Sequence, residues 1–142
     1  MNTRVLLVDD EESFTEVLSE RLRNRKLEVD TAASGPEALK YVDSKDYDAV
    51  VLDLAMPEMD GLETLQRLLK RNPDLQVIIL TGYGTVKDGV KAIQDGAMEF
   101  LEKPVDLEKL TQKIAQAQIQ RVVITEKRME ATMTDILRSK GW

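Results

Sequence analysis

The feature that most constrains this chain is a set of short, uninterrupted apolar runs separated by segments with helical periodicity. Residues 5–8, 49–52 and 77–80 contain no polar side chain. Strands buried on both faces have this composition, whereas half-exposed strands alternate apolar and polar residues. Two weaker runs, residues 28–32 and 100–102, are interpreted as an edge strand and a fifth strand. The alternation predicts a parallel sheet with crossover helices.

Helical segments fill the gaps, and polar residues are expected at their starts. Five residues are candidates for helix caps: Ser13, Ser34, Asp60, Thr85 and Asp106. The first three stand three residues before a glutamate, which is the spacing of a capping box. Gly96 is expected to follow the end of the fourth helix. The order is (βα)5, which predicts a doubly wound α/β domain of five parallel strands over residues 1–118.

Residues 119–142 lie beyond that domain and are expected to form a helical extension or linker. Apolar side chains recur there at spacings of three and four, with Glu126 interrupting the series: Ile119, Val122, Met129, Met133 and Ile136. This spacing predicts a helix, which could continue the fifth helix or start anew. The β-branched residues 122–125 lower helix propensity, so a break at that point is compatible with the sequence.

Composition excludes several functional classes. The chain has 26 acidic and 20 basic residues, a net charge of −6, which argues against direct nucleic-acid binding. It has no cysteine, so disulfides and thiolate chemistry are excluded. It has no histidine either, so any phosphohistidine must come from a partner. The first apolar run is too short for a signal peptide or a membrane span, and a cytoplasmic location is expected.

Polar residues follow the predicted strands at positions that would share one edge of the sheet. Asp9 and Asp10 follow the first strand, Asp53 the third, Thr81 the fourth and Lys103 the fifth. In open α/β sheets, ligands bind outside the carboxyl ends of the strands where the strand order reverses. If the order is 2-1-3-4-5, the first and third strands are neighbours. The three aspartates would then converge.

Clustered carboxylates repel one another unless a cation balances their charge. Mg²⁺ suits a site with a few carboxylates and several waters. Lys103 would add a positive charge and Thr81 a hydroxyl donor, a combination that phosphoryl transfer to a carboxylate requires. Taken singly, these residues are more often caps, turn formers or surface groups. Their joint position at successive strand ends favours the functional interpretation.

Four ordered motifs carry a family resemblance: VLLVDDEESF, DAVVLDLAMPEMDGLETL, VIILTGYG and GAMEFLEKPVD. Through them the chain, from residue 3 to about residue 118, resembles a response-regulator receiver domain of two-component signalling, which has a flavodoxin-like fold. The resemblance implies that Asp53 accepts a phosphoryl group from a sensor histidine kinase. It also implies that Asp10 and Asp53 bind Mg²⁺ directly and Asp9 largely through water. The backbone carbonyl of Ala55 would be a further ligand.

The resemblance implies roles for other residues as well. Lys103 would contact the phosphoryl oxygens, and the Lys103–Pro104 peptide bond would be cis. Thr81 and Phe100 would act as the switch that links the site to the face formed by the fourth helix, fifth strand and fifth helix. Ala55 offers no polar side chain to orient a water molecule, which suggests slow self-dephosphorylation.

Three functions are compatible with these residues. The first is a stand-alone receiver that acts on an unidentified protein target, favoured by the absence of an effector domain in this sequence. The second is the receiver of a larger transcription activator, because TGYGTV and FLEKPVD resemble receivers of enhancer-binding activators. Its extension could then pair two protomers as a homodimer. The third is an aspartyl-phosphate phosphatase of the haloacid dehalogenase type, which needs a second aspartate where this chain has Ala55. If the chain is a receiver, we expect it to catalyse its own phosphorylation but not to act as a turnover enzyme. We also expect it to have no membrane partner.

Overall fold

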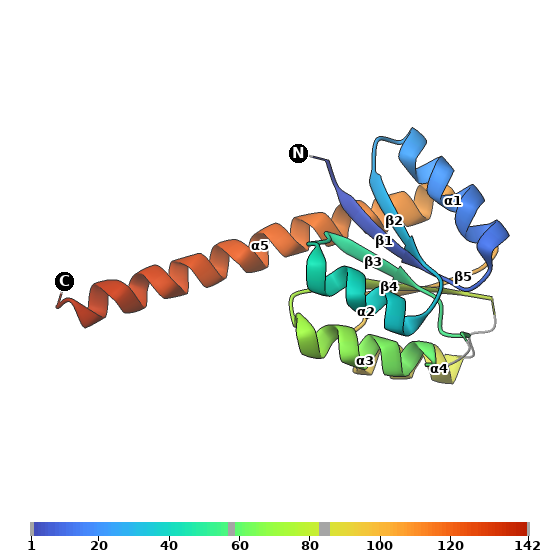
Figure 1. The fold of residues 1–142 in the computed structure, drawn as a ribbon. Helices are drawn as coiled ribbons and strands as arrows, with labels where there is room; N and C mark the ends of the chain where they lie inside the picture. The colour runs from blue at the N-terminus through green and yellow to red at the C-terminus, as the bar shows by residue number, and fades with distance from the viewer. Residues whose placement is uncertain (1, 57–58, 83–85, 142) are drawn as a thin grey trace.

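The computed structural model (Figure 1) describes residues 2–56, 59–82 and 86–141. Among these residues, five parallel strands form one sheet: β1 (Arg4–Val8), β2 (Glu28–Ala32), β3 (Ala49–Leu52), β4 (Val77–Thr81) and β5 (Glu99–Glu102). The strand order is β2-β1-β3-β4-β5, so the predicted order is confirmed. The two weakest apolar runs of the sequence, β2 and β5, form the edges of the sheet.

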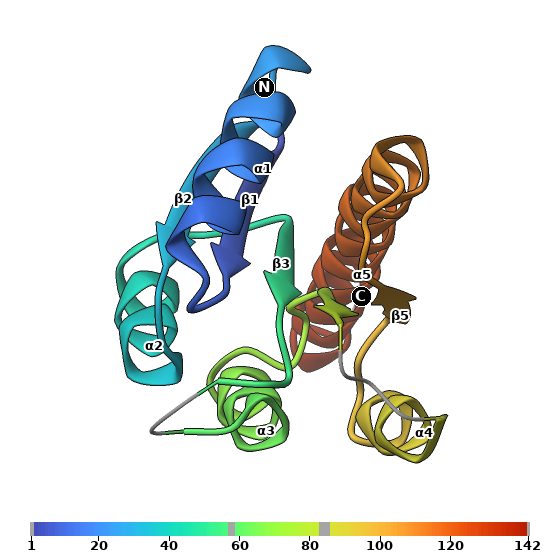
Figure 2. The same ribbon diagram turned by 90° about the vertical axis from the view of Figure 1, so that its right-hand side faces the viewer.

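In the described part of the chain, five helices cover the two faces of the sheet: α1 (Glu12–Asn24), α2 (Gly35–Ser44), α3 (Gly61–Arg71), α4 (Val86–Gln94) and α5 (Leu107–Ser139). The helices α1 and α5 pack on one face, and α2, α3 and α4 pack on the other (Figures 1 and 2). The fold is therefore a flavodoxin-like α/β domain, as the sequence predicts.

Both faces of the central strands are buried, which explains their uninterrupted apolar composition. In β1, Leu6 and Val8 pack toward α2–α4, whereas Val5 and Leu7 pack toward α1 and α5. All four side chains are at most 1% exposed. Burial of apolar surface on this scale is the main source of stability in such a domain.

Three of the predicted caps are present. Ser34, Asp60 and Asp106 each accept a hydrogen bond from the backbone N–H three residues later. Gly96 follows α4 with a φ of +108°, as expected for a helix C-terminus. The predicted cap at Thr85 lies outside the described residues.

The prediction for Ser13 is wrong. The helix α1 starts at Glu12, so Ser13 lies inside its first turn, and the N-cap residue Glu11 makes no side-chain cap. The Asp9 carboxylate instead accepts the N–H of Glu11 at 2.9 Å. The N-cap position of α1 therefore lies two residues earlier than the capping pattern indicates, at Glu11.

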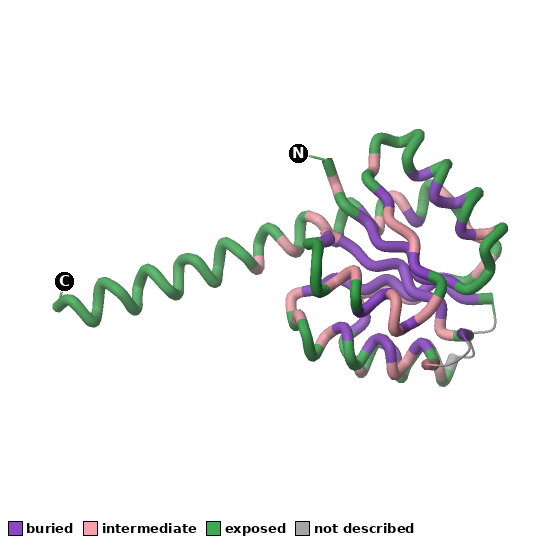
Figure 3. The backbone as a smooth tube through the Cα atoms, viewed as in Figure 1, coloured by how far each residue is buried: buried purple, intermediate pink, exposed green. Residues whose placement is uncertain are grey.

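Of the two alternatives for the extension, the structure has the continuation: α5 runs without interruption from Leu107 to Ser139, and no break occurs at residues 122–125. The propensity penalty of β-branched residues is only tenths of a kcal/mol each, and the flanking segments are good helix formers. In α5, which the structure describes in full, no residue beyond Ala117 is buried, and the helix projects from the domain (Figure 3). No helix among the described residues is apolar enough over a sufficient length to cross a bilayer.

The start of α3 packs directly on the backbone that follows β3. Gly61 donates its N–H to the carbonyl of Leu54 at 2.9 Å. A Cβ atom at Gly61 would lie 2.2 Å from the Cα of Leu54 and 2.6 Å from the carbonyl oxygen of Asp53. Only glycine permits this approach, which fixes the segment after Asp53.

We predict that Gly61→Ala lowers the free energy of unfolding by about 1–3 kcal/mol, because the clashing atoms are backbone and cannot rotate away. Urea unfolding measures this change. Gly82→Ala is the control, since a Cβ there would lie no closer than 3.7 Å to Lys103. Equal losses in the two variants would contradict the prediction.

Candidate functional site

The parallel hydrogen-bond ladder continues one residue beyond three of the strands and places the site residues side by side. The N–H of Asp9 donates to the carbonyl of Ala32, and the N–H of Asp53 donates to that of Val8. Lys103 donates in the same way to Thr81 on β4, at 3.0 Å. The polar residues therefore lie at the carboxyl edge because the sheet's own register holds them there.

The three predicted aspartates form one cluster. Asp9, Asp10 and Asp53 each offer a carboxylate oxygen, and these atoms lie within 4.8 Å of one another. Asp9 and Asp53 are 3% and 4% exposed, whereas Asp10 is open to solvent. The cluster lies where β1 and β3 meet, at the point where the strand order reverses.

Lys103 lies between the two buried carboxylates. Its Nζ is 2.7 Å from Oδ2 of Asp9 and 3.7 Å from Oδ2 of Asp53. The other oxygen of each carboxylate accepts a backbone N–H, from Glu11 at 2.9 Å and from Ala55 at 3.1 Å. Each buried carboxylate is thus held at one oxygen and turned toward the lysine with the other.

Two neighbours of Lys103 were not predicted as site residues. The Glu11 carboxylate lies 3.7 Å from Nζ, and the Phe14 ring centroid lies 4.1 Å from it. The aromatic face attracts the ammonium group electrostatically. Both residues belong to the motif DDEESF: Glu11 directly follows Asp10, and Phe14 lies in the first turn of α1.

Burial raises the pKa of the Asp9 carboxyl, and the hydrogen bonds from Lys103 and from the Glu11 amide only partly oppose this effect. Burial alone would lower the pKa of Lys103, but its hydrogen bond to Asp9 and the surrounding carboxylates outweigh this and raise it. The lysine is therefore held as a cation. One ammonium group faces several carboxylates, so the site carries an excess of negative charge.

The remaining predicted residues surround this cluster. Thr81 is buried at the end of β4, and the Lys103–Pro104 peptide bond is cis. Ala55 is exposed, with its N–H directed to Asp53. Phe100 is half-buried against the core on the α2–α4 side of the sheet.

A hollow lies beside Phe100 on the outer face of α4 and β5. Its volume is about 430 Å³, and it is lined by Gly89, Val90, Ile93, Gln94, Glu99, Phe100 and Glu102. A Cβ atom at Gly89 would lie 3.2 Å from the Phe100 ring, so the glycine allows the ring to approach α4 closely. Val90 and Ile93 are exposed there, so this face has an apolar surface next to the site.

The strand order and the acidic cluster at its reversal point define a flavodoxin-like domain with a ligand site between β1 and β3. The chain belongs to the response regulator receiver domain family, whose model matches residues 5–115.

Relatives of this chain include larger regulators. It is 40% identical over 131 residues to the transcriptional regulatory protein GlrR of Escherichia coli (strain K12), covering 92% of this chain and 30% of that protein. It is 39% identical over 113 residues to the transcriptional regulatory protein ZraR of Klebsiella oxytoca, covering 80% of this chain and 26% of that protein. The chain therefore spans about a third or less of the length of these curated relatives.

Solved structures show the same fold. The crystal structure of adenylate cyclase from Rhodopirellula baltica superposes on this chain with a TM-score of 0.86 at 30% identity, covering 93% of this chain and 98% of that one. The structure of NtrX from Brucella abortus superposes with a TM-score of 0.82 at 28% identity, covering 90% of this chain and 29% of that one.

Lys103→Met tests the electrostatic account of the site. Without the ammonium group the Asp9 pKa, already raised by burial, rises further above its unfolded value. A carboxyl with a raised folded-state pKa destabilises the protein above that pKa, and the penalty disappears below the unfolded pKa. We expect a loss of about 2–4 kcal/mol at pH 7, which shrinks as the pH falls.

Urea unfolding with a chelator at several pH values measures this loss. Lys45→Met is the control, because it removes an exposed ion pair with Asp30 and should cost at most about 1 kcal/mol. A pH-independent loss in Lys103→Met would contradict the account.

Proposed function

We propose that this domain is a phosphorylation-operated receiver and that Asp53 accepts the phosphoryl group from the phosphohistidine of a sensor histidine kinase. The observation that carries the proposal is the placement of the Asp53 carboxylate. It is buried, anchored at one oxygen by the Ala55 amide, and turned with the other toward Lys103 beside two further aspartates. These 142 residues contain no histidine, so none of them can be the phosphohistidine donor.

In the proposed step, an oxygen of the Asp53 carboxylate attacks phosphorus in line with the leaving group. The new O–P bond forms as the P–N bond of the donor breaks, and the electron pair returns to the imidazole nitrogen. Lys103, whose Nζ lies 3.7 Å from Oδ2 of Asp53, stabilises negative charge on the transferring oxygens. The Thr81 hydroxyl, at the end of the neighbouring strand, donates to the phosphoryl group once it is in place.

The residues at this site fit Mg²⁺. The donors are the carboxylate oxygens of Asp9, Asp10 and Asp53, and the single ammonium group of Lys103 offsets only part of their charge, so a divalent cation would balance the remainder. Asp10 and Asp53 are the direct ligands in this proposal, with the Ala55 carbonyl as a third and Asp9 acting largely through water. When bound, the ion would neutralise charge on the phosphoryl oxygens.

The consequence of phosphorylation is proposed to be a change at the α4–β5–α5 face. A phosphoryl group adds roughly −1.5 to −2 charges and three acceptor oxygens. Thr81 moves toward it, and Phe100 moves inward behind Thr81. This movement remodels the apolar hollow of Gly89, Val90 and Ile93, where a downstream protein or effector domain would bind.

The relatives favour the receiver of a larger transcription activator over a stand-alone receiver, because GlrR and ZraR are about three times or more the length of the matched segment. In this reading α5 beyond residue 118 is the linker to an effector domain and pairs two protomers. This chain itself would contact neither nucleic acid nor membrane and would work in the cytoplasm. It would catalyse its own phosphorylation without turning over a substrate. A phosphatase of the haloacid dehalogenase type would need a second aspartate at position 55, where this chain has the exposed Ala55.

Incubation with a labelled small acyl phosphate and Mg²⁺ tests the proposal. We expect wild-type protein to take up label, and Asp53→Asn to take up none because the amide is a poor nucleophile. Asp43→Asn is the matched control, since Asp43 lies on α2 in an exposed ion pair with Arg71. Label retained by Asp53→Asn, or uptake that persists after chelation of Mg²⁺, would refute the proposal.

A further inference from the structure

An aromatic ring covers one side of the Lys103 ammonium group, and the phosphoryl transfer described above does not use it. Nζ of Lys103 lies over the ring of Phe14, 4.1 Å from its centroid. The lysine side chain is only 14% exposed, and Phe14 is half-buried. The face of an aromatic ring carries partial negative charge and attracts an ammonium group within about 6 Å of the centroid. The ring is therefore an uncharged partner of the lysine.

One carboxylate fixes both the lysine and the start of the helix that carries the ring. Oδ2 of Asp9 accepts a hydrogen bond from Nζ of Lys103 at 2.7 Å, and Oδ1 accepts the backbone N–H of Glu11 at 2.9 Å. Glu11 is the N-cap residue of α1, and its carbonyl oxygen accepts the Thr15 hydroxyl at 3.0 Å. Phe14 lies within this first turn. The position of the ring relative to the ammonium group thus follows from the bonds of Asp9.

The apolar core supports the ring as well. Phe14 packs against the buried cluster on the α1 and α5 side of the sheet, and so does Val105. Both residues line an apolar groove of about 500 Å³ together with Val17 and Pro104. Val105 therefore shares the packing of Phe14 but has no aromatic face, which makes it a matched control position.

The charged partners of Lys103 favour the position that it occupies beside Asp9. Nζ is 2.7 Å from Oδ2 of Asp9 but 3.7 Å from Oδ2 of Asp53. It must move by about 1 Å to reach charge-assisted hydrogen-bond distance on the Asp53 side. A hydrogen bond to a carboxylate oxygen is directional and weakens during such a move. Attraction to a ring face has no single acceptor atom, so it persists while the ammonium group moves across the ring.

We propose that Phe14 is a positioning residue for phosphoryl transfer: its ring retains the ammonium group of Lys103 between Asp9 and Asp53 and lets it pass from one carboxylate to the other. The inference rests on the proposed function, in which Asp53 is the acceptor. Phe14 contacts neither the phosphoryl group nor the acceptor in this account, and it acts through Lys103 alone.

The rate of label uptake from a small acyl phosphate at saturating Mg²⁺ tests the functional part. Phe14→Leu keeps most of the apolar volume but removes the ring face, and we expect a rate constant roughly three- to tenfold lower. Phe14→Met should behave in the same way. Phe14→Tyr keeps the ring and should stay within about twofold of wild type. Val105→Ala removes apolar packing from the same groove and should also stay close to wild type.

Proton NMR of unphosphorylated protein with isotopically labelled lysine tests the contact itself. Methylene protons beside Nζ that lie over a ring face are shifted upfield by the ring current. We expect one upfield lysine signal in wild type, and its absence from Lys103→Met assigns it to Lys103. The signal should persist in Phe14→Tyr and Val105→Ala and return to the ordinary lysine position in Phe14→Leu. Circular dichroism confirms that each variant is folded.

Several outcomes would overturn the inference. A rate in Phe14→Tyr or Val105→Ala as low as that in Phe14→Leu would show that Phe14 contributes packing alone. A wild-type spectrum without the upfield signal would exclude the contact. If the upfield signal is present but wild-type protein takes up no label, the proposed function fails and the contact stands. If wild type and Phe14→Leu take up label at equal rates, the positioning role alone fails.

Discussion

The ion pair between Lys103 and Asp9 is the interaction on which the carboxyl edge of this sheet depends. It joins the ends of β5 and β1, two strands that are not neighbours, across the ends of β3 and β4. It also leaves Asp53 with a lysine 3.7 Å away and a net excess of carboxylate around it. A buried carboxylate without such a partner would be strongly destabilising. The same arrangement stabilises the folded edge and leaves the excess of negative charge on which the proposed Mg²⁺ binding and phosphoryl transfer rest.

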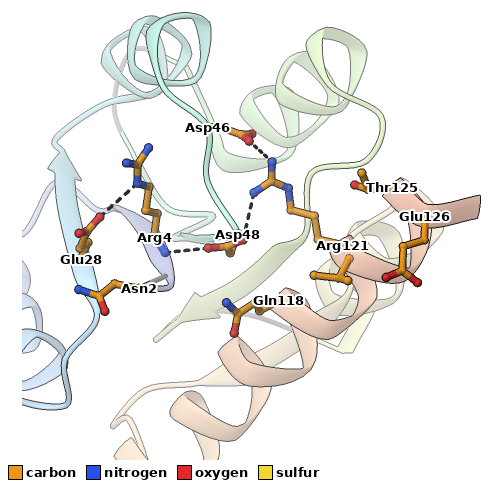
Figure 4. Close-up of a pocket in the computed structure, with 10 residues that line it drawn as sticks. Asn2, Arg4, Glu28, Asp46, Asp48, Gln118, Arg121, Thr125 and Glu126 are labelled. Carbon is orange, nitrogen blue, oxygen red and sulfur yellow. Dashed lines mark hydrogen bonds and ion pairs between the residues drawn. The ribbon is translucent and has the colours of Figure 1, made fainter. Parts of the chain in front are cut away.

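The two opposite ends of β3 and β4 carry different groups of polar residues. Asp48 precedes β3 and Asp53 follows it, while Asp74 lies before β4 and Thr81 ends it. The aspartate cluster therefore lies at the carboxyl edge, and the ion pairs of Arg121 with Asp48 (Figure 4) and of Arg128 with Asp74 lie at the amino edge. The core between them is buried on both faces, whereas these ion pairs are partly exposed and worth about 0–1 kcal/mol each.

Much of this arrangement follows from the sequence, because the uninterrupted apolar runs and the residues directly after them determine which side chains share an edge. Asp9, Asp10 and Asp53 could be grouped on that basis alone. The start of α1 could not be predicted in this way, since the Asp9 carboxylate, and not the Ser13 side chain, accepts a backbone N–H there. Nor could the continuity of α5, because a weak local preference at residues 122–125 yields to the helical segments on either side. The contacts of Glu11 and Phe14 with Lys103 depend on how α1 packs, which no local pattern encodes.

The most direct test of the central claim is chemical identification of the phosphorylated residue. Treating the protein with an acyl phosphate and Mg²⁺, and then with borohydride, reduces an aspartyl phosphate to homoserine, which peptide mass spectrometry can locate. The account predicts homoserine at position 53 alone, dependent on prior exposure to the phosphodonor. Homoserine at position 9 or 10, or none at 53 in folded protein, would contradict it.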